Sequence, residues 1–74
     1  MTYFYVFLNG GLGLRKESKF RFNSLSSAIA FANEKANEIS LNGVSLKKEL
    51  NLNWWKDKDG NSRVRVYNDV FDIV

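Results

Sequence analysis

Cationic and aromatic side chains recur at every second residue in several segments of this chain. A two-residue period places such side chains on one face of a β-strand. Lysine and arginine bind phosphates and carboxylates, and aromatic rings stack on nucleobases or anchor protein interfaces. We therefore predict a face that binds a nucleic acid or an acidic protein surface. Its predicted members are Arg15, Lys19, Arg21, Lys47, Trp55, Arg63, Arg65 and Tyr67.

An ordinary solvated sheet face is the alternative interpretation of the same residues. Glu17 and Glu49 share the parity of the cations and can form cross-strand ion pairs with them. An exposed tryptophan beside several arginines exceeds what solubility requires, which favours a functional face. The two adjacent tryptophans point to opposite faces, so we assign Trp54 to the core and Trp55 to the binding face. The alternatives for Trp55 are the sheet edge and a dimer seam.

The composition provides no set of catalytic or metal-binding residues. Histidine and cysteine are absent, which removes the commonest general base and the commonest metal ligands. Asp57, Asp59 and Asn61 resemble the start of a calcium loop, but Gly60 comes too early and the final bidentate acid is missing. The glycine-rich residues 10–13 precede a strand, whereas a phosphate cradle needs a helix there. We therefore expect no enzyme, metal or cofactor.

Size and charge restrict the class of protein. The 74 residues form one domain, residues 1–74, in which a short chain must build a dense aromatic and aliphatic core or dimerise. The net charge of +3 favours an acidic or polyanionic partner only weakly. No stretch is long and apolar enough to span a bilayer, and the first residues lack the features of a signal peptide. We therefore expect a cytoplasmic protein without a membrane partner.

The first half of the chain predicts a β-hairpin followed by a helix. Residues 2–8 and 14–22 have strand composition and are joined by a glycine-rich loop. Which parity of residues 2–8 is buried stays open, although we favour Tyr3, Tyr5 and Phe7 on the binding face because a tyrosine hydroxyl tolerates water. Ser24 is a good helix N-cap, and Asn42-Gly43 is a stop signal after residue 40. The predicted buried stripe comprises Leu25, Ala28, Ile29, Ala32, Ala36 and Ile39.

The second half predicts two more strands. Apolar and polar residues alternate from Val44 to Trp54, which indicates one long strand over residues 44–56 with an interruption at Lys48. Residues 57–62 have turn composition, and residues 63–67 continue as a strand. Phe71 and Ile73 have the wrong parity to extend that strand, which indicates a bulge or a fresh strand. The residues expected on the helix-covered face are Phe20, Phe22, Leu50, Leu52, Val64 and Val66.

These elements define an α+β fold in ββαββ order. We predict an antiparallel sheet of four to five strands with one α-helix packed on one face. The opposite face of the sheet is then free to meet a partner.

Certain motifs resemble those of small phage anti-CRISPR proteins. The resemblance covers about the last three quarters of the chain and rests on Phe20 to Phe22, Ser24-Leu25-Ser26-Ser27-Ala28, and Lys58-Asp59-Gly60 before Arg63. It implies a non-enzymatic protein that blocks a CRISPR effector by occupying the surface that would hold nucleic acid. The chain is also similar, more distantly, to the three-stranded arm-binding domains of integrases, although it has one strand too few before the helix.

Pattern and resemblance together predict a non-enzymatic binding protein. The expected role is that of a phage or mobile-element inhibitor of a bacterial defence complex in the host cytosol. The first alternative is a small nucleic-acid-binding protein that uses the same face. The second is a structural homodimer module without a ligand.

Overall fold

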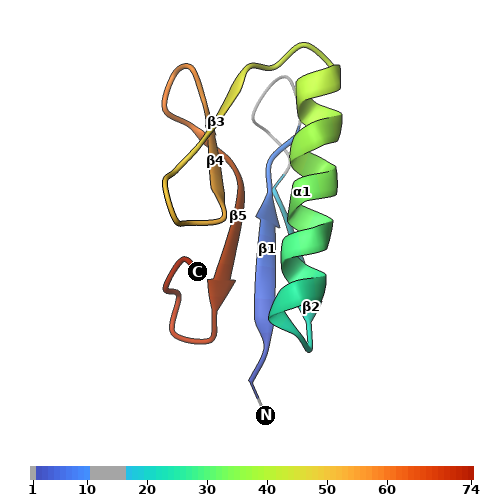
Figure 1. Ribbon diagram of the computed structural model, residues 1–74, viewed down its shortest axis with the longest axis vertical. Helices are drawn as coiled ribbons and strands as arrows, with labels where there is room; N and C mark the ends of the chain where they lie inside the picture. Colours follow the sequence, from blue (N-terminus) through green and yellow to red (C-terminus); the bar gives the residue numbers. More distant parts are fainter. Residues whose placement is uncertain (1, 11–16) are drawn as a thin grey trace.

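The computed structural model describes residues 2–10 and 17–74 and places them in strands around one helix (Figure 1). The elements in chain order are β1 (Phe4–Leu8), β2 (Ser18–Phe22), α1 (Leu25–Leu41), β3 (Leu46–Lys48), β4 (Trp54–Asp57) and β5 (Ser62–Asn68). Residues 11–13 of the predicted loop after β1 and the predicted site residue Arg15 lie outside the described residues.

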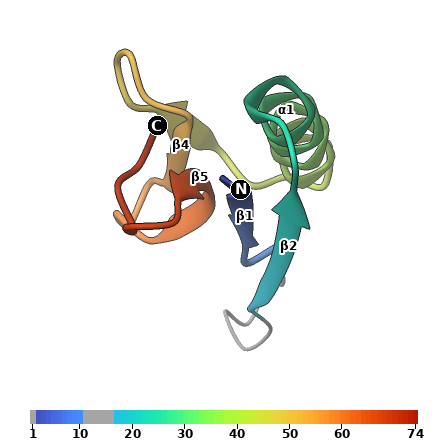
Figure 2. The same ribbon diagram turned by 90° about the horizontal axis from the view of Figure 1, so that it is seen from below.

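The strands form one five-stranded antiparallel sheet in the order β2-β1-β5-β4-β3. The two central strands, β1 and β5, come from opposite ends of the chain. Figure 2 shows α1 on one side of this sheet. The predicted α+β class, with one helix on one face of an antiparallel sheet, is confirmed.

The helix begins and ends where local capping chemistry predicts. Ser24 has an extended backbone, and its hydroxyl accepts a hydrogen bond of 3.1 Å from the backbone N–H of Ser27. This bond satisfies one of the N–H groups that have no partner within the first turn. At the other end, Asn42 caps the helix, and Gly43 adopts a φ of 94° that favours glycine.

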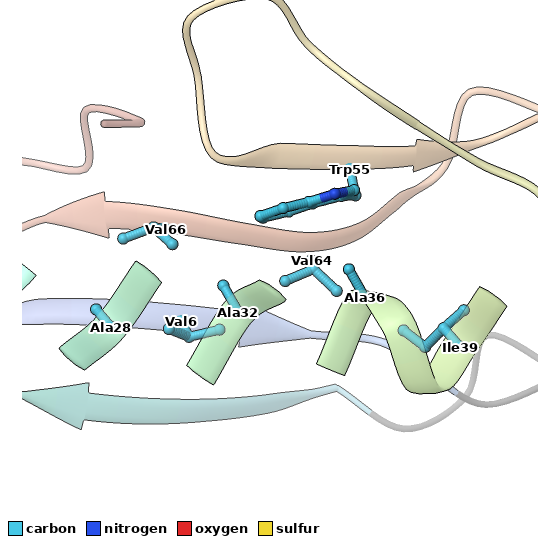
Figure 3. Close-up of a cluster of buried hydrophobic side chains, with 8 residues drawn as sticks. All are labelled: Val6, Ala28, Ala32, Ala36, Ile39, Trp55, Val64 and Val66. Atoms are coloured by element: carbon cyan, nitrogen blue, oxygen red, sulfur yellow. The ribbon is translucent and has the colours of Figure 1, made fainter. Parts of the chain in front are cut away.

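The core lies between α1 and the inward side of the central strands (Figure 3). Ala28 and Ala32 are fully buried against the sheet, and their small side chains let the helix backbone approach it closely. Val6, Val64 and Val66 are also fully buried, and each stabilises the fold by roughly 1.5–3 kcal/mol. Ala36, Ile39 and Trp55 complete the cluster.

The predicted helix stripe differs from the structure at Leu25, Ile29 and Phe31. Ile29, expected to be buried, is only half-buried and lies outside the core cluster. Leu25, expected to be buried, is 37 % exposed because it lies in the first turn, near the edge of the sheet. Phe31 instead packs against the core, with its ring centroid 4.8 Å from that of Phe20 and 5.2 Å from that of Phe22. An aromatic side chain is long enough to reach the outer strand from a position beside the alanine stripe.

The prediction of one continuous strand over residues 44–56 is wrong. The chain reverses after β3, where the backbone N–H of Glu49 donates to the carbonyl oxygen of Trp54 at 2.8 Å and Asn51 has a φ of 64°. Leu50, predicted to face the helix, is 86 % exposed in this turn. The long strand is therefore two strands of a hairpin, β3 and β4, and the observed order is ββαβββ.

The predicted irregularity after residue 68 takes the form of a turn that returns the chain to β5. The Asn68 side chain accepts hydrogen bonds from the backbone N–H groups of Val70 and Asp72, and Phe71 has a φ of 65°. Ile73 then pairs with Tyr67 in an isolated antiparallel bridge. The Val74 N–H donates to the Val66 carbonyl oxygen at 2.9 Å, so these last residues extend the sheet beside the end of β4.

In the part of the chain that the structure describes, no helix is long and apolar enough to cross a membrane.

Candidate binding face

The side of the sheet opposite α1, here called the open face, collects cationic and aromatic side chains. The register places Tyr5 between Arg21 and Tyr67, and Phe7 between Lys19 and Arg65. These residues share a face because directly opposed residues in antiparallel strands point the same way. The favoured parity of the first strand is therefore confirmed. The open face comprises Tyr3, Tyr5, Phe7, Lys19, Arg21, Lys47, Trp54, Lys56, Arg65 and Tyr67.

Cations on the open face lie over aromatic rings. The Arg21 guanidinium is 4.6 Å from the Tyr3 ring centroid, and that of Arg65 is 4.0 Å from the Phe7 ring centroid. The Lys19 ammonium lies 5.6 Å from the ring centroid of Tyr5. At exposed sites, such cation–π contacts stabilise by about 0.5–1 kcal/mol each. They hold the charges close to the sheet.

Trp54 and Lys56 form a fourth pair on the same face. The Lys56 ammonium is 3.9 Å from the Trp54 ring centroid and also forms a 3.0 Å ion pair with Glu49. The Trp54 indole N–H donates a 2.7 Å hydrogen bond to the Ser62 hydroxyl. These contacts fix the side chains of β4 against β5. One of the expected glutamate–cation pairs is thus present, although its cation is Lys56 rather than an arginine.

Tyr67 lies at the centre of the aromatic part of the open face. Its ring stacks on Tyr5 with a centroid separation of 5.4 Å and on Phe71 at 6.0 Å. The stacking leaves Tyr67 only 8 % exposed, whereas Phe71 is 78 % exposed. Burial raises the pKa of the Tyr67 hydroxyl; the nearby Arg65 charge opposes this shift, and Tyr5 adds to it. Tyr67 is therefore neutral over the physiological range.

A hollow of about 370 Å³ lies next to Arg65 at one end of the open face. The hollow is polar and contains charges of both signs, which suits a hydrogen-bonding ligand group better than an apolar one. Its lining residues are Phe7, Asn9, Glu17, Asn61, Ser62 and Arg65.

The prediction that Arg63 belongs to the exposed binding face is wrong. Trp55 opposes Val64 and Lys56 opposes Ser62, so Arg63 is an extra residue in β5, a β-bulge. Its guanidinium donates to Asp57 Oδ2 at 3.0 Å and to the Asn9 carbonyl oxygen at 3.2 Å. Arg63 is only 5 % exposed. A bulge changes the facing of a side chain, so the alternation could not place this residue.

The assignments of the two tryptophans are reversed in the structure. Trp55, predicted on the binding face, is 7 % exposed and belongs to the core (Figure 3). Trp54, predicted in the core, lies on the open face opposite Arg65. The β3–β4 register pairs even-numbered with odd-numbered residues, such as Lys48 with Trp55. The helix-facing parity therefore changes between the two strands.

The remaining predicted site residues lie in two places. Lys19, Arg21, Arg65 and Tyr67 are brought together on the central and outer strands. Lys47 opposes Lys56 on the far edge strand β3 and is exposed. Trp54, Lys56 and Phe71 were missed. The interruption at Lys48 and the asparagines at 51 and 53 were the signals for a turn that would have placed Trp54 and Lys56.

Hydrogen bonds between residues of the acidic turn after β4 stabilise that turn. Asp57 Oδ1 accepts hydrogen bonds from the backbone N–H groups of Asp59 and Asn61, and Gly60 has a φ of 83°. The turn predicted for residues 57–62 is confirmed, and its carboxylate is already engaged. Among residues 2–10 and 17–74, no group of three or more acidic side chains is arranged to hold a metal ion.

The fold and the open face define a small α+β domain with a cationic and aromatic sheet surface. Comparison with protein-family models, with curated proteins and with solved structures gives no match.

Proposed function

We propose that this protein is a non-enzymatic binding protein whose open face binds an acidic surface of a protein complex. One observation carries the proposal: Lys19, Arg21 and Arg65 each lie over an aromatic ring on a sheet face that α1 leaves uncovered. Arginine and tyrosine are enriched at protein interfaces, and a cation already held in place loses less conformational entropy on binding.

The ring contacts favour a protein partner over a nucleic acid. Base stacking requires an aromatic plane that is free to receive the base. Lys19 covers one side of the Tyr5 ring, Tyr67 stacks on Tyr5, and Arg65 covers Phe7. The cations remain able to meet carboxylates, for which arginine provides a bidentate fork.

The resemblance to small anti-CRISPR proteins suggests which complex this is. We propose a phage- or mobile-element-encoded inhibitor that acts on a CRISPR-type defence complex in the host cytosol. A channel that holds nucleic acid is itself basic and would repel the open face. The contact is therefore proposed on an acidic surface beside that channel, from which the bound chain obstructs entry of the nucleic acid.

The experiment measures target-DNA binding by purified CRISPR effectors after incubation with this protein. Inhibition by the wild type is expected, with loss in Arg65→Glu because the charge is reversed at the centre of the open face. Lys58→Glu is the matched control, since it makes the same change of charge in the exposed turn after β4. Inhibition that survives Arg65→Glu would exclude the open face as the contact surface.

Nucleic-acid binding is the second candidate, and one specific observation favours it. Phe71 is 78 % exposed and stacks on Tyr67, and it lines a hollow together with Tyr67 and the Arg65 cation. Titration of a labelled single-stranded oligonucleotide at low and physiological salt separates the two functions. We expect weak binding that disappears as salt rises. Tight binding at physiological salt, lost in Phe71→Ala, would replace the protein partner with a nucleic acid.

A further inference from the structure

The outer edge of β2 is a second surface of this protein with unused backbone hydrogen-bonding capacity. β2 pairs with β1 on one side and forms the margin of the sheet (Figure 2). Among residues 2–10 and 17–74, no segment pairs with its other side, and Ser18–Arg21 are all exposed. An open edge of this kind is the usual site at which a sheet accepts an additional strand.

The register identifies which backbone groups face this edge. Successive residues of an antiparallel strand direct their N–H and C=O groups alternately to the two neighbouring strands. The Asn9 N–H donates to the Arg63 carbonyl oxygen, so odd-numbered residues of β1 face β5 and even-numbered ones face β2. The even-numbered residues oppose Ser18, Phe20 and Phe22. Lys19 and Arg21 consequently direct their N–H and C=O groups outward.

The side chains along this edge differ between the two faces of the sheet. Lys19 and Arg21 place two positive charges on the open face. On the helix side, Phe20 is 37 % exposed beside Phe31, and Leu25 at the start of α1 is also 37 % exposed. A strand added here meets cations on one face and apolar surface on the other.

We propose that the outer edge of β2 binds an extended segment of another protein in which acidic and apolar residues alternate. The acidic residues oppose Lys19 and Arg21, and the apolar residue between them covers Phe20. Opposite charges across paired strands are stabilising, and like charges are destabilising. Lys19 and Arg21 also belong to the open face, but this inference does not rest on the proposed function, because it depends on the backbone groups at the outer edge of β2.

The same charges argue against a second copy as the occupant. Antiparallel pairing of two β2 edges about Phe20 would set the Lys19 of each copy against the Arg21 of the other. Cationic side chains on edge strands are a common protection against such self-association. In this register the edge favours an acidic strand over a second copy.

The test uses a labelled peptide with the core Glu-Val-Glu-Val-Glu and two N-methylated forms of it. In antiparallel strand addition with the glutamates opposite Lys19 and Arg21, the glutamate N–H groups face β2 and the valine N–H groups face away. Methylation of the glutamate nitrogens should weaken binding at least tenfold, whereas methylation of the valine nitrogens should change it less than twofold. All three peptides carry the same charge, so equal affinities, or no binding of the parent peptide, would overturn the proposal.

Protein variants and amide exchange locate the peptide. Lys19→Glu with Arg21→Glu should abolish binding, and Arg65→Glu should retain it, which separates this edge from the surface tested above. Slowed hydrogen exchange at the Lys19 and Arg21 amides on peptide binding would support strand addition. Unchanged hydrogen exchange at these two amides, or an equal loss of peptide binding in Arg65→Glu, would overturn the proposal. A dimer in sedimentation that dissociates in Lys19→Pro would also overturn it, because a second copy would then be the occupant.

Discussion

The Arg63 guanidinium donates a hydrogen bond from Nε to Oδ2 of Asp57 across 3.0 Å, and both side chains are almost sealed from solvent, at 7 % and 6 % exposed. The pair joins the bulge of β5 to the end of β4. A second Arg63 bond, from Nη1 to the Asn9 carbonyl oxygen, adds the end of β1. The β4–β5 hairpin is thus tied to the end of β1, which is distant from it in sequence, at one corner of the sheet.

Removal of either member of this pair should destabilise the protein strongly. A buried charge that loses its partner keeps its desolvation cost without the compensating attraction. Arg63→Met and Asp57→Asn should each lower the midpoint of urea unfolding, and the double variant should lose less than the sum of the two. Lys58→Met, in the same turn but exposed, is the control. A midpoint for Arg63→Met equal to that of the control would show that the pair does not support the fold.

The pair should also make stability depend on acid pH. Burial raises the pKa of the Asp57 carboxyl, but hydrogen bonds from the Asn61 backbone, Arg63, the Asn61 side chain and the Asp59 backbone outweigh it and hold that pKa below its ordinary value of 3.8. The folded state therefore binds this proton less readily than the unfolded state.

Stability from Asp57 is accordingly present above its ordinary pKa and decreases as the pH falls through the lower pKa of the folded state. Urea unfolding of wild type and Asp57→Asn between pH 7 and pH 2 measures the effect. The difference between the two should be constant near neutrality and shrink below about pH 4, near the ordinary carboxyl pKa. A difference that persists unchanged at pH 2 would contradict the assignment.

The reversed tryptophan assignment predicts distinct fluorescence for the two rings. Trp55 is buried against Val64, whereas Trp54 is half-buried beneath Lys56. Trp54→Phe should leave blue-shifted emission that iodide quenches poorly, and Trp55→Phe should leave red-shifted emission that iodide quenches well. Trp55→Ala should cost about 3–5 kcal/mol of unfolding free energy, as for other buried tryptophans. Red-shifted emission in Trp54→Phe and blue-shifted emission in Trp55→Phe would instead support the sequence-based assignment, with Trp54 in the core and Trp55 on the open face.

The contact between α1 and the sheet should not tolerate a charge. Ala32 is fully buried, so Ala32→Asp should cost roughly 3 kcal/mol or more by burying an unpaired carboxylate. Ala30→Asp is the matched control because residue 30 is exposed on the same helix, and only a loss of helix propensity of under about 1 kcal/mol is expected there. Thermal unfolding followed by circular dichroism compares them. Equal melting temperatures would mean that Ala32 does not face the sheet.

Local chemistry within the sequence determined the helix, the first strand pairing and the turn of residues 57–62. The Ser24 cap, the spacing of the alanines and the Asp57-to-Asn61 turn bonds each involve residues close in the chain. The sequence also predicted that Tyr5, Lys19 and Arg65 share one face of the sheet, because a two-residue period persists along any uninterrupted strand. These elements are enough to define the class of fold and most of the open face.

Tertiary structure decided at which residues the alternating side chains exchange the two faces of the sheet. The reversal at Asn51 exchanges the faces of the residues that follow it, and the extra residue at Arg63 turns that side chain away from the open face. The interruption at Lys48 and the asparagines at 51 and 53 indicate a turn, but they do not specify how the strands after it pair, and the alternation from Arg63 to Tyr67 shows no sign of the bulge. Whether the chain continues or reverses depends on which strands pair, and that is settled by burial of Trp55 against Val64 and of Arg63 against Asp57. The contacts that fix these choices lie between strands, so a single-strand pattern could not contain them.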